Sequence, residues 1–136
     1  SNKGFEGLAW DPRNQRLLLA NEKNPVRLFS LACDGRRVSG PLQALGDLDG
    51  YVTDVAGLSV DSRSGQLLAL SQESHLLLGL DPQLRAQSFL ALLPGLNGLT
   101  RRVPQAEGLA LDNAGNLYVV SERNLFFAFQ REVGAP

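Results

Sequence analysis

The sequence is poor in residues on which several classes of protein depend. Its 136 residues include one cysteine, one histidine and no methionine. Because Cys33 is the only cysteine, the fold cannot depend on an intramolecular disulfide. The formal net charge is only −1, and basic residues form no run longer than the pairs Arg36-Arg37 and Arg101-Arg102. Nucleic-acid binders usually concentrate basic charge on one surface, so we expect no nucleic-acid partner.

Long apolar runs are also absent. None approaches the ~18 residues of a transmembrane helix, so we expect no direct membrane span in this segment. The start of the sequence lacks the basic and apolar regions of a signal peptide. Ser1-Asn2 resembles the remnant of a cleaved tag, and patterned sequence begins abruptly at Gly4-Phe5. We therefore expect one domain taken from a longer protein whose targeting segment lies outside this sequence.

Signatures of nucleophilic catalysis are missing as well. His75 is the only histidine, and it occupies the start of an expected strand, so we interpret it as a structural position. The segment 57–61 has no closing glycine of the kind that a G-x-S-x-G nucleophile elbow requires. The glycines at 95 and 98 are not accompanied by the lysine of a phosphate-binding loop. We assign no catalytic residue.

What the sequence does contain is a repeat of about 50 residues. Its three copies are FEGLAWDPRNQRLLLANEKN (5–24), VAGLSVDSRSGQLLALSQES (55–74) and AEGLALDNAGNLYVVSERN (106–124). The same glycine recurs in each copy, as Gly7, Gly57 and Gly108. An aspartate that begins a turn also recurs, as Asp11, Asp61 and Asp112, and an Asx turn accounts for it. Because apolar, glycine and turn positions align together, the repeat predicts three copies of one structural unit.

Each unit has the pattern of β-strands separated by turns. In the first copy the strands are GLAW, RLLLA and VRLFSL, and corresponding runs follow in the other two copies. A fourth strand is expected over 37–45 and again over 86–93, but none is convincing after Phe129. Leucine runs can also be helical, but turns at intervals of about ten residues favour strands.

Four antiparallel strands in about 50 residues are typical of a β-propeller blade. We therefore predict an all-β fold of three blades over residues 4–53, 54–104 and 105–136. Because blades stack face to face, their strands should be apolar on both faces. A closed propeller has about four to eight blades, so we interpret the chain as half of a six-bladed propeller. The missing half is either further chain or a second copy, and we expect no free monomer, because open blade faces would expose large apolar surfaces.

Three segments of the sequence carry a resemblance to a known family. GFEGLAWDP (4–12), VAGLSVDSRSGQLLALSQES (55–74) and QAEGLALDNAGNLYVVSERN with the following LFFAF (105–129) resemble the bacterial SdiA-regulated family. The most specific parts are PQAEGLALD (104–112) and NLYVVSERNLF (116–126). The resemblance implies a six-bladed propeller of about twice this length, often preceded by a membrane anchor or signal, and thus a location in the bacterial envelope. It implies no enzymatic activity. The Glu-Gly element is also similar to one in gluconolactonase-like and phytase-like propellers, where acidic residues near the axis bind calcium.

Glutamates at the start of the repeat are the first candidate site. Glu6 and Glu107 occupy equivalent positions, and the second copy has Ala56 there, so the fold does not require the carboxylate. Calcium prefers six to eight oxygen ligands, and carboxylates are among them. We therefore predict Glu6, Glu107 and Glu122 as metal ligands, with a solvated or salt-bridged structural role as the alternative. Asp54, which stands alone before the second copy, is the weakest metal candidate.

The tetrads after the second strand of each copy, NEKN, SQES and SERN, are the second candidate site. In a propeller such loops lie on one rim, where Glu22, Asn24 and Asn124 could contact a ligand. The alternative is a turn whose side chains bond the local backbone. The sequence thus predicts a non-enzymatic binding module for a small molecule or protein, with calcium in its channel, and a calcium-dependent phytase-like or lactonase-like hydrolase as the alternative function.

Overall fold

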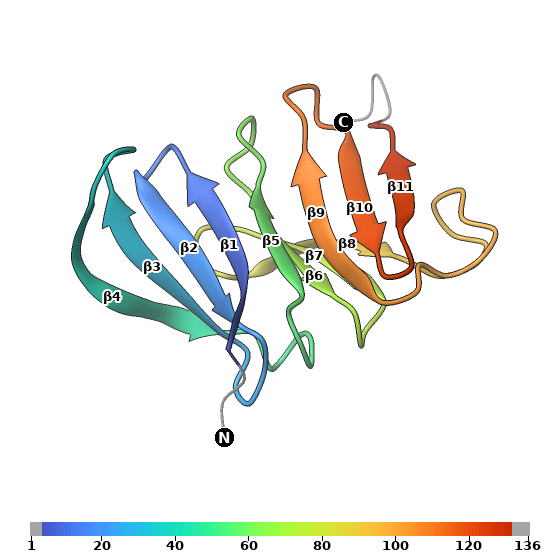
Figure 1. Cartoon of the computed structure of the whole chain (residues 1–136), viewed down its shortest axis with the longest axis horizontal. Helices are drawn as coiled ribbons and strands as arrows, with labels where there is room; N and C mark the ends of the chain where they lie inside the picture. The colour runs from blue at the N-terminus through green and yellow to red at the C-terminus, as the bar shows by residue number, and fades with distance from the viewer. Residues whose placement is uncertain (1–3, 132–136) are drawn as a thin grey trace.

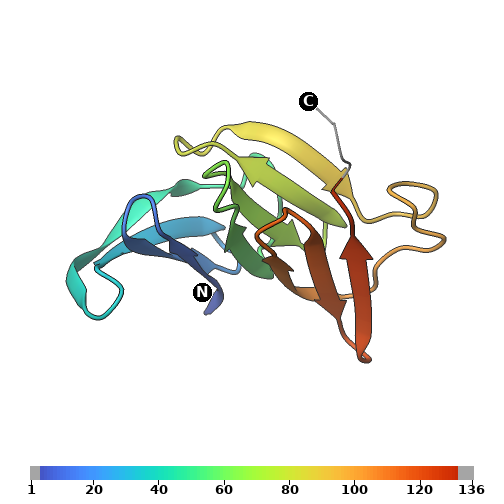
Figure 2. The ribbon, with the colours of Figure 1, turned by 90° about the horizontal axis from the view of Figure 1, so that it is seen from above.

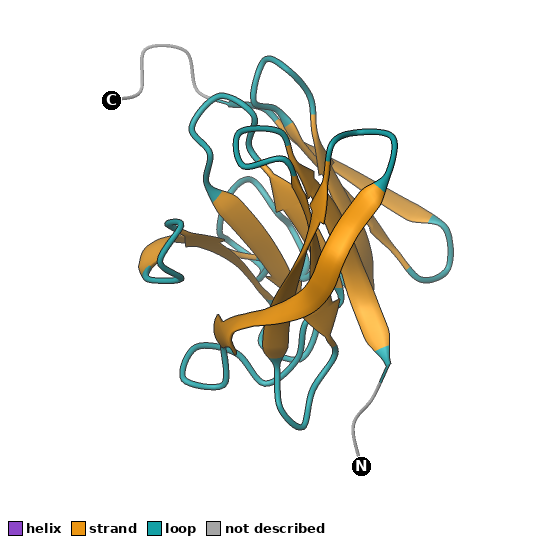
Figure 3. Ribbon diagram, turned by 90° about the vertical axis from the view of Figure 1, so that its left-hand side faces the viewer, coloured by secondary structure: helices purple, strands orange, loops and turns teal. Residues whose placement is uncertain are grey.

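The computed structural model describes residues 4–131, which form strands, turns and loops and no helix (Figure 3). These residues therefore include no helix that could span a membrane. The first sheet contains β1 (Phe5–Asp11), β2 (Arg16–Asn21), β3 (Arg27–Cys33) and β4 (Val38–Asp47). The second contains β5 (Gly57–Val60), β6 (Leu67–Ser71), β7 (Leu76–Leu80) and β8 (Ala86–Ala91). The third contains β9 (Ala106–Leu111), β10 (Leu117–Ser121) and β11 (Leu125–Phe129).

Each sheet is an antiparallel meander in which strands pair in chain order. The structure confirms the predicted strands of every copy, including the fourth strands β4 and β8. The three sheets, called blades 1 to 3 from here on, lie side by side in chain order (Figures 1 and 2). Their first strands, β1, β5 and β9, form the inner row, in which each contacts the next.

The repeated aspartates close the first hairpin of each blade. The Asp11 carboxylate accepts a hydrogen bond from the Asn14 backbone N–H (3.3 Å), and that of Asp61 accepts one from the Arg63 N–H (2.9 Å). Asp112 accepts backbone hydrogen bonds from Ala114 and Asn116, both at 2.9 Å. These bonds, together with others from the Asn116 and Tyr118 side chains, lower the pKa of Asp112 to about 2. The repeated aspartate is therefore a turn residue.

Side chains alternate between two faces of each blade, and we name the faces by the neighbour that they contact. The forward face points to the following blade. In blade 1 it consists of Gly7, Ala9, Leu18, Ala20, Leu28 and Ser30, all buried. The backward face points to the preceding blade. In blade 2 it consists of Leu58, Val60, Leu67, Ala69, Leu78 and Leu80, which pack against the forward face of blade 1.

The second interface repeats the first. Leu68, Leu70 and Leu77 on the forward face of blade 2 pack against Leu109, Leu111, Leu117, Val119, Phe127 and Phe129 on the backward face of blade 3. The repeated glycine permits this approach. A Cβ on Gly7 would lie 2.8 Å from Leu58 Cγ, and one on Gly57 would lie 2.8 Å from Leu109 Cδ2. Blades 1 and 2 thus each present a glycine to the leucine that follows the glycine of the next blade.

The prediction that every strand is apolar on both faces holds only for the middle of the structure. All of β6 and most of β7 are buried, because blade 2 is covered on both sides. It is wrong for the outer strand β4, most of whose residues are exposed. An outermost strand lies far from the neighbouring blades, so its residues need not be apolar.

Candidate functional site

The two equivalent glutamates lie at irregularities in the inner strands. In β1 the pairing with β2 shifts between Phe5 and Gly7, so Glu6 is the extra residue of a β-bulge. In β9 the partners of Ser121 and Val120 are Ala106 and Gly108, so Glu107 is the extra residue there. A bulge re-aims the side chain that it carries. Both glutamates are therefore exposed at one end of the inner row.

Acidic side chains from all three blades act on Glu107. Partial burial is the main cause that raises the pKa of Glu107 above the ordinary glutamate value of 4.5. The further causes are the negative charges of Glu122, Glu6, Glu22 and Asp54. We call the four glutamates Glu6, Glu22, Glu107 and Glu122 the acidic mouth. The structure thus brings the three residues of the predicted metal site to the same end of the molecule, together with Glu22 from the predicted rim.

Asp54, also predicted as a metal candidate, is used differently. Its side chain is buried, with 3% of the residue exposed. The carboxylate accepts hydrogen bonds from the Ser71 hydroxyl and from the backbone N–H groups of Gln72 (3.3 Å) and Glu73 (3.1 Å). Through these hydrogen bonds the Asp54 carboxylate holds the turn between β6 and β7. The bonding of Asp54 therefore supports a structural role.

The acidic mouth does not make a preformed metal centre by itself. Among residues 4–131, no three or more histidine, cysteine, aspartate or glutamate side chains are arranged to hold a metal ion. Calcium would require six to eight oxygen ligands, more than these glutamates bring together. Metal binding by Glu6, Glu107 and Glu122 therefore stays a prediction that depends on ligands from outside the described residues.

Turn geometry alone accounts for the two rim asparagines. Asn24 and Asn124 follow β2 and β10, and each has a φ of 62°. Asparagine is among the few residues that adopt this left-handed conformation readily. Glu22 is held by its backbone, since its N–H donates to the Gly4 carbonyl (3.1 Å) and its carbonyl accepts from the Val55 N–H (2.9 Å). Ligand contact at these three positions remains a prediction.

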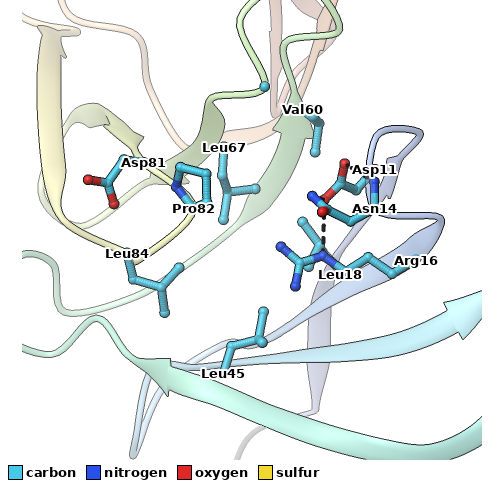
Figure 4. A pocket seen from close by; sticks show the side chains of 11 residues that line it. Asp11, Asn14, Arg16, Leu18, Leu45, Val60, Leu67, Asp81, Pro82 and Leu84 are labelled. Atoms are coloured by element: carbon cyan, nitrogen blue, oxygen red, sulfur yellow. Dashed lines mark hydrogen bonds and ion pairs between the residues drawn. The ribbon is translucent and has the colours of Figure 1, made fainter.

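The opposite end of blades 1 and 2 contains a small pocket (Figure 4). Asp11, Asn14 and Arg16 line it on one side, and the turn between β7 and β8 lines the other. The Asp11 carboxylate already pairs with the Arg16 guanidinium at 3.0 Å. Burial raises the pKa of Asp11, but the hydrogen bonds from Asn14 and Arg16 together outweigh it, and the pKa is lowered. The free space of about 20 Å³ is enough for one water molecule. This pocket is a packing gap and offers no ligand site.

A larger groove between blades 2 and 3 was not predicted from the sequence. It lies between the β6–β7 turn, the connection from β8 to β9 and the β10–β11 turn. Its lining includes Arg101, Arg102 and Arg123 as well as His75 and Glu122. Arg101-Arg102 was the one available signal, but an isolated pair of arginines usually indicates an ordinary solvated surface. Only the folding of the chain shows that Arg123 and His75 lie at the same groove.

Replacement of Glu107 by glutamine tests whether the charge on Glu107, which is partly buried and near other carboxylates, destabilises the fold. A folded-state pKa above the unfolded value favours folding below the unfolded pKa, and this contribution is lost as pH rises through the folded pKa. Glu107→Gln should therefore raise the melting temperature by about 1–2 °C at pH 7 and should have no such effect below about pH 4. Thermal unfolding at both pH values measures the difference.

A glutamate with the opposite shift provides the control. Hydrogen bonds from Lys23 and Thr53 lower the pKa of Glu73, so Glu73→Gln should lower the melting temperature at pH 7. Equal effects of both substitutions on the melting temperature at pH 7 would show that the charge on Glu107 does not destabilise the fold.

Comparison with solved structures identifies the architecture. A chain in the crystal structure of the nidogen/laminin complex is similar to this one, with a TM-score of 0.63 and 14% sequence identity. The match covers 88% of this chain and 40% of that chain, so the present chain spans less than half the length of its neighbour. That neighbour is a β-propeller, and at this identity the likeness shows the fold alone.

The family comparison covers nearly the whole sequence. The family model described as SdiA-regulated matches residues 1–130. Its extent includes all three blades and both bulged glutamates. The chain belongs to the SdiA-regulated family.

Proposed function

We propose that this chain is half of a six-bladed β-propeller that acts as a non-enzymatic binding module in the bacterial envelope. The observation that carries the proposal is that both ends of the blade row expose the surfaces that are buried between its blades. Each interior interface joins a forward face to a backward face. The chain leaves one face of each kind uncovered, as a segment of a ring does.

The backward face of blade 1 is one of the two uncovered surfaces. It consists of Leu8, Trp10, Leu17, Leu19, Phe29 and Leu31. Leu8 is 64% exposed, whereas Leu58, at the equivalent position of blade 2, is 5% exposed. The difference between these two leucines is that, among residues 4–131, a preceding blade covers only Leu58.

The forward face of blade 3 is the other uncovered surface. It consists of Gly108, Ala110, Tyr118, Val120, Phe126 and Ala128. Phe126 is 64% exposed, whereas Leu77, its counterpart in blade 2, is 5% exposed. Gly108 offers the position that Gly7 and Gly57 offer at the interior interfaces, and Leu8 is the matching leucine. Two such segments can therefore cover all four open faces by repeating contacts that are already present.

A closed ring would also enlarge the acidic mouth. Three further blades related to these would bring a second set of carboxylates to the same end of the channel. The raised pKa of Glu107 supports this proposal, because the negative charges of the neighbouring carboxylates contribute to it in addition to partial burial. A bound cation would offset these charges, and we therefore propose a divalent cation, with calcium as the first choice, as a ligand of the closed ring.

Calorimetric titration of the associated chain with calcium tests the ligand part of the proposal. We expect saturable binding by the unmodified chain and at least tenfold weaker binding by Glu107→Ala, because a ligand carboxylate is lost. Glu73→Ala is the matched control and should bind normally, since Glu73 pairs with Lys23 and Thr53. If the unmodified chain binds no calcium at millimolar concentration, the cation proposal is wrong, whereas ring closure is tested separately by the mass of the assembly.

A further inference from the structure

The groove between blades 2 and 3 has the dimensions of a small-molecule site. Its volume is about 670 Å³, within the range of roughly 300–1,000 Å³ that is common for ligand pockets. Residues from three separate segments line it, namely the β6–β7 turn, the connection 92–105 and the β10–β11 turn. Both blades that form the groove belong to the same chain, so its integrity does not depend on closure of the ring.

Backbone hydrogen bonds fix the wall that carries two of its arginines. The Leu92 N–H donates to the His75 carbonyl (2.8 Å), and the Val103 N–H donates to the Leu92 carbonyl (3.1 Å). On the other side, the Glu122 N–H donates to the Gln105 carbonyl (3.2 Å). Val103 is also buried, with 1% of the residue exposed. Arg101 and Arg102 are thus attached to a connection that is anchored to both blades.

The positive charges in the groove are not neutralised by protein groups. Within residues 4–131, the side chains of Arg101, Arg102 and Arg123 form no ion pair and no hydrogen bond. Of the two carboxylates in the lining, Glu73 is already engaged by Lys23 and Thr53. Glu122 is the other, and it belongs to the acidic mouth at the inner end. Three guanidinium groups therefore face one uncommitted carboxylate.

His75 lies in the lining of the groove together with the arginines. Its Nδ1 atom is removed from solvent and has no hydrogen-bond partner among the described residues. The residue lines the groove at the end of the β6–β7 turn, and its φ of 50° is a left-handed turn conformation that histidine adopts more often than most residues. A buried polar atom without a partner is uncommon in folded proteins. Because the atom is closed to solvent, it would reach a ligand in the groove only after the imidazole ring turns.

We propose that this groove binds a small molecule through its oxyanion group, either a phosphate or a carboxylate. Arginine presents planar, paired N–H donors that match both groups, and charge-assisted hydrogen bonds of this type are strong. The arginines come from two sides of the groove, which favours enclosure of one anionic group rather than contact with an extended polyanion. The near-neutral net charge of the chain agrees with a small ligand.

Titration with inorganic phosphate, and separately with succinate, tests the proposal by nuclear magnetic resonance on the isotope-labelled chain. We expect saturable shifts in the Arg101, Arg102 and Arg123 side chains and in neighbouring backbone amides. The double substitution Arg101→Gln and Arg102→Gln should weaken binding about tenfold or more. The chain has a second arginine pair outside the groove, and Arg36→Gln with Arg37→Gln should leave binding unchanged.

The outcomes of the titrations either support or contradict the binding of an oxyanion in the groove. Saturable shifts with only one anion support the proposal and identify its chemistry as phosphate or carboxylate. Shifts that spread equally over Arg36 and Arg37, or that do not saturate, would show general charge attraction and overturn it. Unchanged amide spectra outside the substituted segment establish that the glutamine variants are folded, so a loss of binding reports on the groove itself.

Discussion

Substitution of Leu8 by arginine is expected to convert the associated chain into a monomer of 14.7 kDa. Leu8 is the most exposed residue of the backward face of blade 1, and we place it against Gly108 of the neighbouring forward face. A guanidinium group there would be buried among apolar side chains without a partner, which costs several kcal/mol. Sedimentation velocity of the variant and the unmodified chain measures the change.

Two controls distinguish ring closure from nonspecific hydrophobic association. Leu96→Arg replaces a comparably exposed leucine in the connection between β8 and β9, outside both open faces, and should leave association intact. A mixture of Leu8→Lys and Ala110→Glu chains should associate although neither does alone, because one interface pairs the new charges and the other is unmodified. Failure of that mixture to associate, or dissociation by Leu96→Arg, would contradict the proposed geometry.

The second large effect is expected from alanine at equivalent leucines of blades 1 and 2. Leu58 lies in the core between these blades, so Leu58→Ala should lower the free energy of unfolding by about 2–5 kcal/mol. Leu8 has the same place in the repeat, but no blade among the described residues covers it. Leu8→Ala should therefore affect only the part of the stability that depends on protein concentration. Denaturant titrations over a range of concentrations distinguish the two variants.

The comparison of these two leucines has an internal check. Far-ultraviolet circular dichroism before denaturation shows whether each variant retains the β-fold. If Leu8→Ala and Leu58→Ala lower the stability equally at the highest dilution, the backward face of blade 1 is buried by something within the chain. That result would argue against an open blade row.

Much of the fold was predictable because the repeat provides three views of one unit. Helix and strand cannot be distinguished from RLLLA alone, but its counterpart NLYVV is rich in β-branched and aromatic residues. The aspartate turns were predictable for the same reason, since Asp11, Asp61 and Asp112 recur where a side-chain acceptor can close a turn. Local hydrogen bonding and strand propensity both act over short distances, which a sequence records directly.

Other features depend on contacts that no local pattern records. The bulges at Glu6 and Glu107 arise from the pairing of one strand with its neighbour, so the exposure of these side chains could not be read from alternation alone. Asp54 precedes β5 and has no counterpart in the other copies of the repeat. Its structural role depends on hydrogen bonds from the β6–β7 turn, which is distant in the sequence. The groove combines His75, Arg101 and Arg123 from three segments that lie outside the repeated strands.

The equivalence of the blade faces explains which apolar side chains are buried and which are exposed. Alternation places apolar residues on two faces of each strand, and the repeated glycine lets the next blade approach closely. Among residues 4–131, only blade 2 has both faces covered, and only its strands β6 and β7 are buried nearly throughout. Exposed apolar area on the two outer blades is thus the consequence of an interrupted row of identical contacts.

Sedimentation equilibrium of the unmodified chain tests the central claim most directly. If the open faces of two copies cover one another, the chain will have a mass of about 29 kDa, twice its 14.7 kDa, and will dissociate only on dilution. A homogeneous 14.7 kDa species at all concentrations would contradict closure of the blade row by a second copy of the chain.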